Sequence, residues 1–303
     1  MISEKAIQRM KLYHLLGELP LRSREISVED ILIEEREHYD LEKLLLDLNG
    51  IELVPAYFVK PKHLPAKTPT ILFNHSHGGF YQLGKNELLE GNVYLQAPPY
   101  AEVLAREGYS TLCIDAWGFG ERAGKTESEI FKEMLWSGQI MWGMMVYDSL
   151  KAIDYLVSRQ DVDNERIGTL GMSMGSTMAW WIAALDTRIK VCVDICCLTD
   201  FQALIDSRGL DEHGIYYYVP HLIRNFTTSQ INALISPRPH LSLAGNYDKL
   251  TPLDGLKRID KDLKAIYESD NASESWKLQR YDSGHLETKE MRSEVLSFLH
   301  RWL

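Results

Sequence analysis

Short apolar segments that alternate with helical patterns constrain the fold of this chain more than any other feature. The apolar segments are residues 70–74, 110–115, 166–172, 189–197, 240–244 and 276–281. The helical patterns are residues 101–107, 138–158, 174–185, 252–267 and 288–302. Continuous apolar runs are typical of strands covered on both faces. The alternation therefore predicts an α/β protein with a mostly parallel sheet between two layers of helices.

The beginning of the chain has a different pattern. Residues 41–49 and 51–60 are predicted strands joined at Asn49-Gly50, a dipeptide that favours a hairpin. We expect residues 1–303 to form one domain, with residues 1–40 as an N-terminal extension. Residues 118–137 and 199–239 interrupt the alternation, and long insertions above strand ends often form pockets. The second of them is rich in aromatic residues and is the predicted lid or pocket insertion.

Charge and hydropathy exclude several classes of protein. The chain has 303 residues and a formal net charge of −10, so we expect no nucleic-acid partner. No apolar run approaches the roughly 20 residues that span a bilayer. Residues 1–20 lack the apolar core of a signal peptide. We therefore expect a cytoplasmic protein with no membrane partner; the sequence does not indicate its oligomeric state.

The segment Gly171-Met172-Ser173-Met174-Gly175 lies between a predicted strand and a predicted helix. G-x-S-x-G in this context is typical of a nucleophile elbow, in which a serine is exposed on a sharp turn. Glycines suit that turn because the strand and the helix pass close together. The sequence therefore predicts Ser173 as a nucleophile, with a tight turn that holds an incidental serine as the alternative.

A serine nucleophile needs a base, and in this type of elbow the chain order is Ser, then Asp or Glu, then His. His285 follows the last predicted strand and is the predicted base, whereas His300 falls on the final helix. Asp248 follows the strand 240–244 and is the predicted acid that orients the base. The alternative acids are Asp194, Asp200, Asp254 and Asp282.

An oxyanion hole is expected beside the nucleophile. Its first donor is the N–H of Met174, and the second comes from the loop after residues 70–74, where we favour His77 and then Gly78. The predicted substrate pocket contains Ser76, Trp117 and Tyr217.

A metal site is the other interpretation of the pair His75 and His77. A zinc site would need further ligands nearby, and the residues that follow are GGFY. We expect no metal and no organic cofactor.

Two segments resemble nucleotide-binding motifs. Residues 118–123 (GFGERA) follow a strand, but no helix pattern begins there. Residues 124–126 (GKT) resemble the end of a P-loop, but residue 119 is Phe where that loop needs a glycine. Both are predicted to be loop, in which Glu121 and Arg122 form an ion pair or line the pocket.

The motifs HSHGG, DAWGFGER, GMSMG, AGNYDKLTP and DSGH occur in this order over residues 40–303. In this they resemble the dienelactone hydrolase and acetyl xylan esterase-like branch of the α/β-hydrolases. The resemblance implies an eight-stranded α/β-hydrolase core with a triad of Ser173, Asp248 and His285. Dienelactone hydrolases use a cysteine nucleophile, so Ser173 departs from them and favours ester hydrolysis. Ser76 is a second departure, because such loops usually contain His-Gly.

The resulting expectation is a serine-dependent carboxylic-ester hydrolase that acts through an acyl-enzyme on small-molecule esters of small acyl groups, such as acetyl. The alternatives are a small acyl- or oligopeptidase-like serine peptidase and a ligand-binding module that retains the fold.

Overall fold

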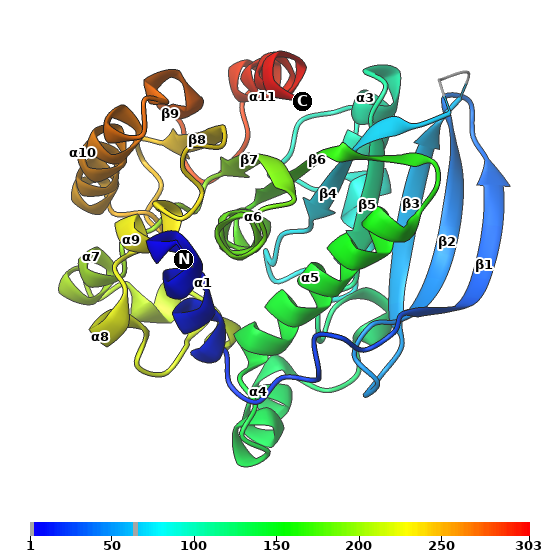
Figure 1. The fold of residues 1–303 in the computed structure, drawn as a ribbon, viewed down its shortest axis with the longest axis horizontal. Coiled ribbons are helices and arrows are strands. Elements are labelled where there is room, and N and C mark those ends of the chain that lie inside the picture. The colour runs from blue at the N-terminus through cyan, green and yellow to red at the C-terminus, as the bar shows by residue number, and fades with distance from the viewer. Residues whose placement is uncertain (1–2, 63–65) are drawn as a thin grey trace.

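The computed structural model describes residues 3–62 and 66–303. Its strands form one nine-stranded sheet in the order β1-β2-β3-β5-β4-β6-β7-β8-β9 (Figure 1). The strands are β1 (Ser27–Glu35), β2 (Tyr39–Asp47), β3 (Val54–Pro61), β4 (Thr68–Asn74), β5 (Ser110–Ile114), β6 (Val162–Met172), β7 (Ile189–Ile195), β8 (His240–Gly245) and β9 (Trp276–Tyr281). β1, β2, β3 and β5 pair antiparallel in that order, and all further pairs from β5 to β9 are parallel. The prediction of a mostly parallel α/β fold is confirmed.

The helices of the described residues surround this sheet. They are α1 (Glu4–His14), α2 (Glu87–Glu90), α3 (Tyr100–Arg106), α4 (Glu127–Trp136), α5 (Met141–Ser158), α6 (Met174–Leu185), α7 (Phe201–Asp206), α8 (Leu222–Asn225), α9 (Thr228–Asn232), α10 (Leu253–Ser269) and α11 (Lys289–Trp302).

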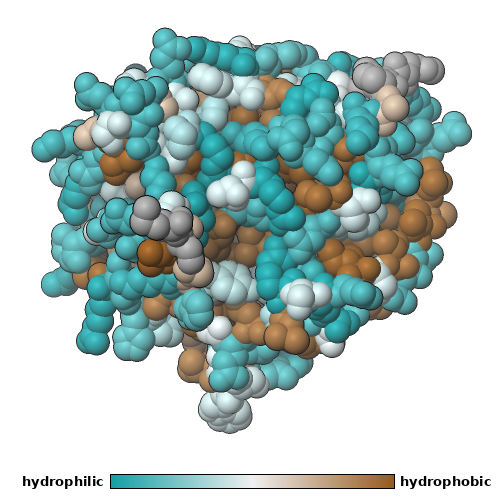
Figure 2. All heavy atoms as spheres, in the orientation of Figure 1, coloured by the Kyte–Doolittle hydropathy of each residue, from teal (hydrophilic) through white to brown (hydrophobic). Residues whose placement is uncertain are grey.

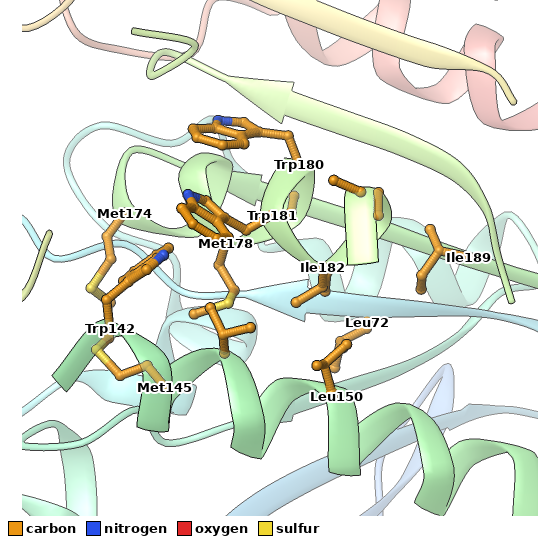
Figure 3. Close-up of a cluster of buried hydrophobic side chains, with 14 of the residues drawn as sticks. Leu72, Trp142, Met145, Leu150, Met174, Met178, Trp180, Trp181, Ile182 and Ile189 are labelled. Atoms are coloured by element: carbon orange, nitrogen blue, oxygen red, sulfur yellow. The ribbon is translucent and has the colours of Figure 1, made fainter. Parts of the chain in front are cut away.

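Two hydrophobic clusters, one on each face, hold the sheet between its helices. On β4, Leu72 packs into the cluster that contains α5 and α6, whereas Ile71 and Phe73 pack into the cluster that contains α3 and α11. This alternation is the period-two pattern of a strand buried on both faces. Figure 3 shows the first cluster, in which Trp142 of α5 approaches Trp181 of α6. Burial on both faces makes the centre of the sheet a rigid support for the loops at its edge.

β1 corrects the expectation for the N-terminal region. Residues 1–40 are not simply an extension, since β1 pairs with β2 and makes the sheet nine-stranded where the resemblance implied eight. Most residues of β1 are exposed, including Leu32. An exposed edge strand carries no apolar alternation, and for this reason the pattern analysis missed it.

The two interrupting segments contain helices. Residues 118–137 include α4, whose N-cap Thr126 forms a capping box with Glu129. Thr126 therefore starts a helix that the sequence analysis did not predict within this segment. Residues 199–239 include α7, α8 and α9. The role of residues 199–239 as a lid stays a prediction.

None of the described helices combines the length and the apolar character needed to cross a membrane.

Candidate active site

Ser173 lies on a strained turn between β6 and α6. Its φ is 59° and its ψ is −118°, a conformation that costs a non-glycine residue on the order of 1–3 kcal/mol. Both flanking glycines are required by close approach. A Cβ on Gly171 would lie 2.2 Å from the Gly175 oxygen, and one on Gly175 would lie 1.9 Å from the Asn74 oxygen. The turn therefore depends on the two glycines of the motif, as a nucleophile elbow does.

His285 lies between Ser173 and Asp248. Its Nε2 is 2.9 Å from Ser173 Oγ, and its Nδ1 is 2.8 Å from Asp248 Oδ2. Because an ionised carboxylate only accepts hydrogen bonds, Nδ1–H donates to Asp248 and Nε2 is left to accept from the serine hydroxyl. Burial lowers the pKa of His285, but the hydrogen bond and the charge of Asp248 raise it by more, so that it lies above its usual value.

The competing residues have other partners in the structure. Their contacts are Asp194 with His240, Asp200 with the N–H of Ala203, Asp254 with Lys257, Asp282 with Asn246, and His300 with Glu107. Only Asp248 among the named acids is recorded as a partner of His285 within the described residues.

The loop of residues 75–79, here called the oxyanion loop, follows β4. The N–H of Ser76 donates to Glu87 Oε1 at 3.0 Å, so it is not free for a substrate. No acceptor is recorded for the N–H groups of His77 and Gly78 within residues 3–62 and 66–303. Met174 is the first residue of α6, where N–H groups lack partners within the helix. In the described part of the chain, the N–H groups of the predicted donors thus have no hydrogen-bond acceptor.

The cavity at Ser173 has a volume of about 250 Å³. Its wall includes residues 76–79 and 212–214, together with Tyr94, Cys197, Tyr216, Leu250 and His285. Among the described residues that line it there is no lysine or arginine. The described lining, which contains Glu212, thus offers no lysine or arginine as a counter-ion for an anionic group.

The predicted pocket residues do not all reach this cavity. Ser76 does, and its hydroxyl bonds to Glu87. Trp117 instead lines a separate cavity of about 380 Å³, where the Arg122 guanidinium lies 4.3 Å from its ring centre. Tyr217 lines another pocket of about 200 Å³. Tyr216 takes the place predicted for Tyr217, because neighbouring residues of the short turn Ile215–Tyr217 point in different directions.

The loop of residues 118–123 is held by ion pairs. Glu121 pairs with Lys85, which also pairs with the buried Asp115. Arg122 pairs with Asp148 and Glu52. Glu121 and Arg122 therefore pair with other residues and not with each other, and Arg122 lines the cavity of about 380 Å³ and not the one at Ser173.

A buried glutamate, Glu87, and a partly buried one, Glu127, lie beside the site and were missed by the sequence analysis. Glu87 accepts hydrogen bonds from Ser76 and Asn92, and burial raises its pKa to about 7. Glu127 contacts His77, Tyr81 and Tyr216. Glu87 had no sequence signal, whereas Glu127 directly follows the capping residue Thr126.

The ring nitrogens of His75 and His77 are occupied by protein groups. His75 Nε2 accepts from the N–H of Ala116 at 3.1 Å, and His75 Nδ1 is 2.9 Å from the Ser76 oxygen. His77 Nδ1 accepts from the N–H of Gly79, and its Nε2 is 3.2 Å from Glu127. In the described part of the chain, no group of three or more His, Cys, Asp or Glu side chains is arranged to hold a metal ion.

Comparisons with known proteins identify relatives of this chain. A model of the X-Pro dipeptidyl-peptidase (S15) family matches residues 50–298. The YtaP protein of Bacillus subtilis strain 168, provisionally named a hydrolase, is 56% identical over 299 residues, which cover 99% of this chain and 100% of that protein.

Solved structures share the fold. A glucuronoyl esterase from Solibacter usitatus gives a TM-score of 0.73 at 14% identity, over 96% of this chain and 91% of that chain. An acetyl xylan esterase from Paenibacillus sp. R4 gives a TM-score of 0.66 at 18% identity, over 98% of this chain and 94% of that chain. At these identities the likeness shows the common fold alone, which is that of the α/β-hydrolases.

Proposed function

This chain belongs to the X-Pro dipeptidyl-peptidase (S15) family of the α/β-hydrolase superfamily, and we propose that it is a serine-dependent carboxylic-ester hydrolase. Its substrates are small-molecule esters of small acyl groups such as acetyl. The observation that carries the proposal is the contact of 2.9 Å between His285 Nε2 and Ser173 Oγ in a cavity of about 250 Å³.

The reaction begins with acylation of Ser173. As Ser173 Oγ attacks the ester carbonyl, His285 Nε2 takes its proton, and Asp248 stabilises the resulting imidazolium. The carbonyl oxygen becomes an oxyanion, which the N–H groups of Met174 and His77 stabilise, with Gly78 as the further donor. His285 then returns the proton to the leaving alcohol as the bond between carbon and oxygen breaks.

Deacylation repeats these steps with water. His285 takes a proton from the water that attacks the acyl-enzyme, and it then protonates Ser173 Oγ as the acid product leaves. Every proton in both half-reactions passes through His285, so no other side chain has to act as acid or base.

The wall of the cavity supports a neutral acyl group. The described residues that line it include the aromatic rings of Tyr94 and Tyr216 and the carboxylate of Glu212, and they include no lysine or arginine that would pair with an anionic acyl group. The names of the esterase structures with the same fold support ester hydrolysis, and the hydrolase name of the Bacillus subtilis relative supports hydrolysis in general. A cytoplasmic location and the lack of nucleic-acid partners stay predictions from the sequence.

A burst assay tests the proposal. Purified protein is mixed with p-nitrophenyl acetate and with longer acyl homologues, and release of p-nitrophenol is followed before and after the first turnover. We expect a burst of about one equivalent and a preference for short acyl chains. Ser173→Ala should lower kcat by at least about 10⁴-fold.

Matched variants complete the assay. Ser293→Ala changes an exposed serine of α11, and His300→Ala changes an exposed histidine that pairs with Glu107 and meets Tyr109 edge-on; both should retain full turnover. Ester turnover that survives in Ser173→Ala would exclude Ser173 as the nucleophile. An absence of turnover on every ester would favour a peptidase or a binding module.

The second candidate is a peptidase, favoured by the description of the family whose model matches. Ala-Pro-p-nitroanilide in the same assay separates the two functions, because amide cleavage requires His285 to protonate an amine. A higher kcat/KM on this peptide than on p-nitrophenyl acetate would make peptidase activity the main function.

A further inference from the structure

We propose that Glu127 is a positioning residue that holds the oxyanion loop against the segment 213–217. The proposal rests on the proposed function, because it concerns the geometry in which His77 and Gly78 stabilise an oxyanion. No sequence motif for catalysis includes Glu127, and its role follows from contacts between segments that are distant in the sequence.

The carboxylate of Glu127 joins these segments directly. Glu127 Oε2 is 3.2 Å from His77 Nε2 and accepts from Tyr81 Oη at 2.9 Å. Glu127 Oε1 accepts from the N–H of Tyr216 at 3.0 Å. His77 and Tyr216 both line the cavity at Ser173. One carboxylate therefore connects two parts of the cavity wall.

A relay of hydrogen bonds leads from Glu127 to the backbone of the oxyanion loop. Because the carboxylate accepts, His77 Nε2 carries the proton and His77 Nδ1 is an acceptor. Nδ1 accepts from the N–H of Gly79 at 3.1 Å. The ring of His77 thus ties its own loop into a turn that contains the N–H of Gly78 and begins at His77, whose N–H is the other predicted donor of this loop.

Aromatic packing restricts the ring of His77 further. The ring stacks on Tyr216, with centroids 5.4 Å apart and an interplanar angle of 22°. It meets Tyr81 and Phe119 edge-on at 5.0 Å and 5.1 Å. A ring enclosed on these sides keeps the orientation that Glu127 selects.

Glu127 differs from the other glutamates of α4. Its side chain is 10% exposed and its ionic contact is with His77, whereas Glu133 is 61% exposed and pairs with Lys125. Burial raises the pKa of Glu127, and hydrogen bonds from His77, Tyr216 and Tyr81 lower it by more, so that it lies below its ordinary value. The carboxylate is therefore ionised at neutral pH and accepts all three bonds.

The test replaces one carboxylate oxygen with an amide. Glu127→Gln keeps the size of the side chain, but its single oxygen cannot accept the bonds of His77, Tyr81 and Tyr216 together. We expect kcat for p-nitrophenyl acetate to fall about 10- to 100-fold with little change in KM, less than the loss of a whole oxyanion donor. Glu133→Gln is the matched control on the same helix and should retain full activity.

A second readout does not require ester turnover. The rate at which a fluorophosphonate labels Ser173 is measured by mass spectrometry. In this reaction His285 takes the serine proton, Oγ bonds to phosphorus as fluoride leaves, and negative charge develops on the phosphoryl oxygen. We expect this rate to fall in Glu127→Gln in parallel with kcat, at an unchanged melting temperature. If the protein labels but hydrolyses no ester, the proposed ester hydrolysis fails while the role of Glu127 is still tested.

A second variant covers the case in which Glu127→Gln does not fold. His77→Asn keeps an acceptor for the N–H of Gly79 but loses the contact with Glu127. If Glu127 acts through His77, this variant should also label slowly, and the double variant should be no slower than the slower single variant. Labelling at the wild-type rate in either folded single variant, or additive losses in the double variant, would overturn the proposal.

Discussion

At the scale of single residues, the protonation of His285 controls the proposed reaction. The ring must be neutral at Nε2 to accept the proton of Ser173, and its pKa lies above the usual value because the contribution of Asp248 exceeds the opposing effect of burial. The acid limb of kcat/KM against pH should therefore lie above pH 6.5, and activity should rise as pH increases through it.

Asp248→Asn tests this origin of the pKa. Removing the charge should move the acid limb to lower pH, while loss of the correct tautomer lowers kcat by about 10⁴-fold. The pH profile of p-nitrophenyl acetate hydrolysis measures both effects. If the acid limb of the pH profile lay at the same pH in Asp248→Asn as in the wild type, a group other than Asp248 would determine its position.

Glu87 makes the stability of the protein depend on pH. Its pKa is about 7 in the folded protein, compared with 4.5 for an unperturbed glutamate, because burial disfavours the charge. Between these values the folded state binds a proton that the unfolded state lacks. The free energy of unfolding should therefore decrease by about 3 kcal/mol in all as pH rises from about 4.5 to about 7.

Urea unfolding at pH 5 and pH 8 tests the contribution of Glu87. In Glu87→Gln, the decrease in the free energy of unfolding that arises from Glu87 should vanish, because the amide does not ionise. An equal decrease in the wild type and in the variant would assign the effect to other groups.

At the scale of elements, the sheet has an exposed edge at β1. Figure 2 shows apolar residues gathered at the side of the molecule where Figure 1 places β1 and β2. Leu32 on β1 is 56% exposed, whereas Leu44 on β2 is 4% exposed and packs into the core. A leucine is therefore exposed to solvent on β1 and buried in the core on the neighbouring strand β2.

A pair of lysine substitutions tests this difference. Leu32→Lys should change the free energy of unfolding by less than about 0.5 kcal/mol, since its side chain already meets water. Leu44→Lys should cost about 4 kcal/mol or more, because it buries an unpaired charge. Thermal unfolding measures the loss of stability in both variants. Equal losses of stability would mean that β1 is covered in solution.

At the scale of the whole molecule, a buried ion pair connects the loop of His285 to a distant part of the chain. Glu287 accepts from Arg292 Nε at 2.8 Å and from the N–H of Gln96 at 2.9 Å, and it also accepts from the hydroxyl of Tyr100. Its own N–H donates to the oxygen of Tyr94 in the cavity wall. The position of His285 thus depends on contacts made nearly 200 residues earlier in the sequence.

Glu287→Gln should remove the partner of a buried charge. The guanidinium of Arg292 would be left uncompensated, at a cost of about 3–5 kcal/mol in the free energy of unfolding. Glu294→Gln on α11, the helix that carries Arg292, breaks a partly exposed pair with Lys277 and should cost no more than about 1 kcal/mol. Similar losses in urea unfolding of the two variants would contradict the special role of Glu287.

Local patterns in the sequence were sufficient for the fold class and for the choice of Ser173, His285 and Asp248. Amphipathic helices and strands have characteristic periods of apolar residues along the sequence. The elbow is a contiguous motif, and its glycines are required by close contacts at that turn. The order of the serine, acid and histidine along the chain then restricted the partners to the ends of later strands. The structure brings these three residues to hydrogen-bonding distance.

Tertiary structure alone decided the rest of the site. Whether an N–H of the oxyanion loop is free depends on Glu87, and whether Tyr216 or Tyr217 lines the cavity depends on how one short turn packs. Packing likewise places Trp117 in the wall of a different cavity. β1 forms a strand because its backbone pairs with that of β2. Burial and pairing are properties of segments that meet in space, so a pattern within any one segment does not contain them.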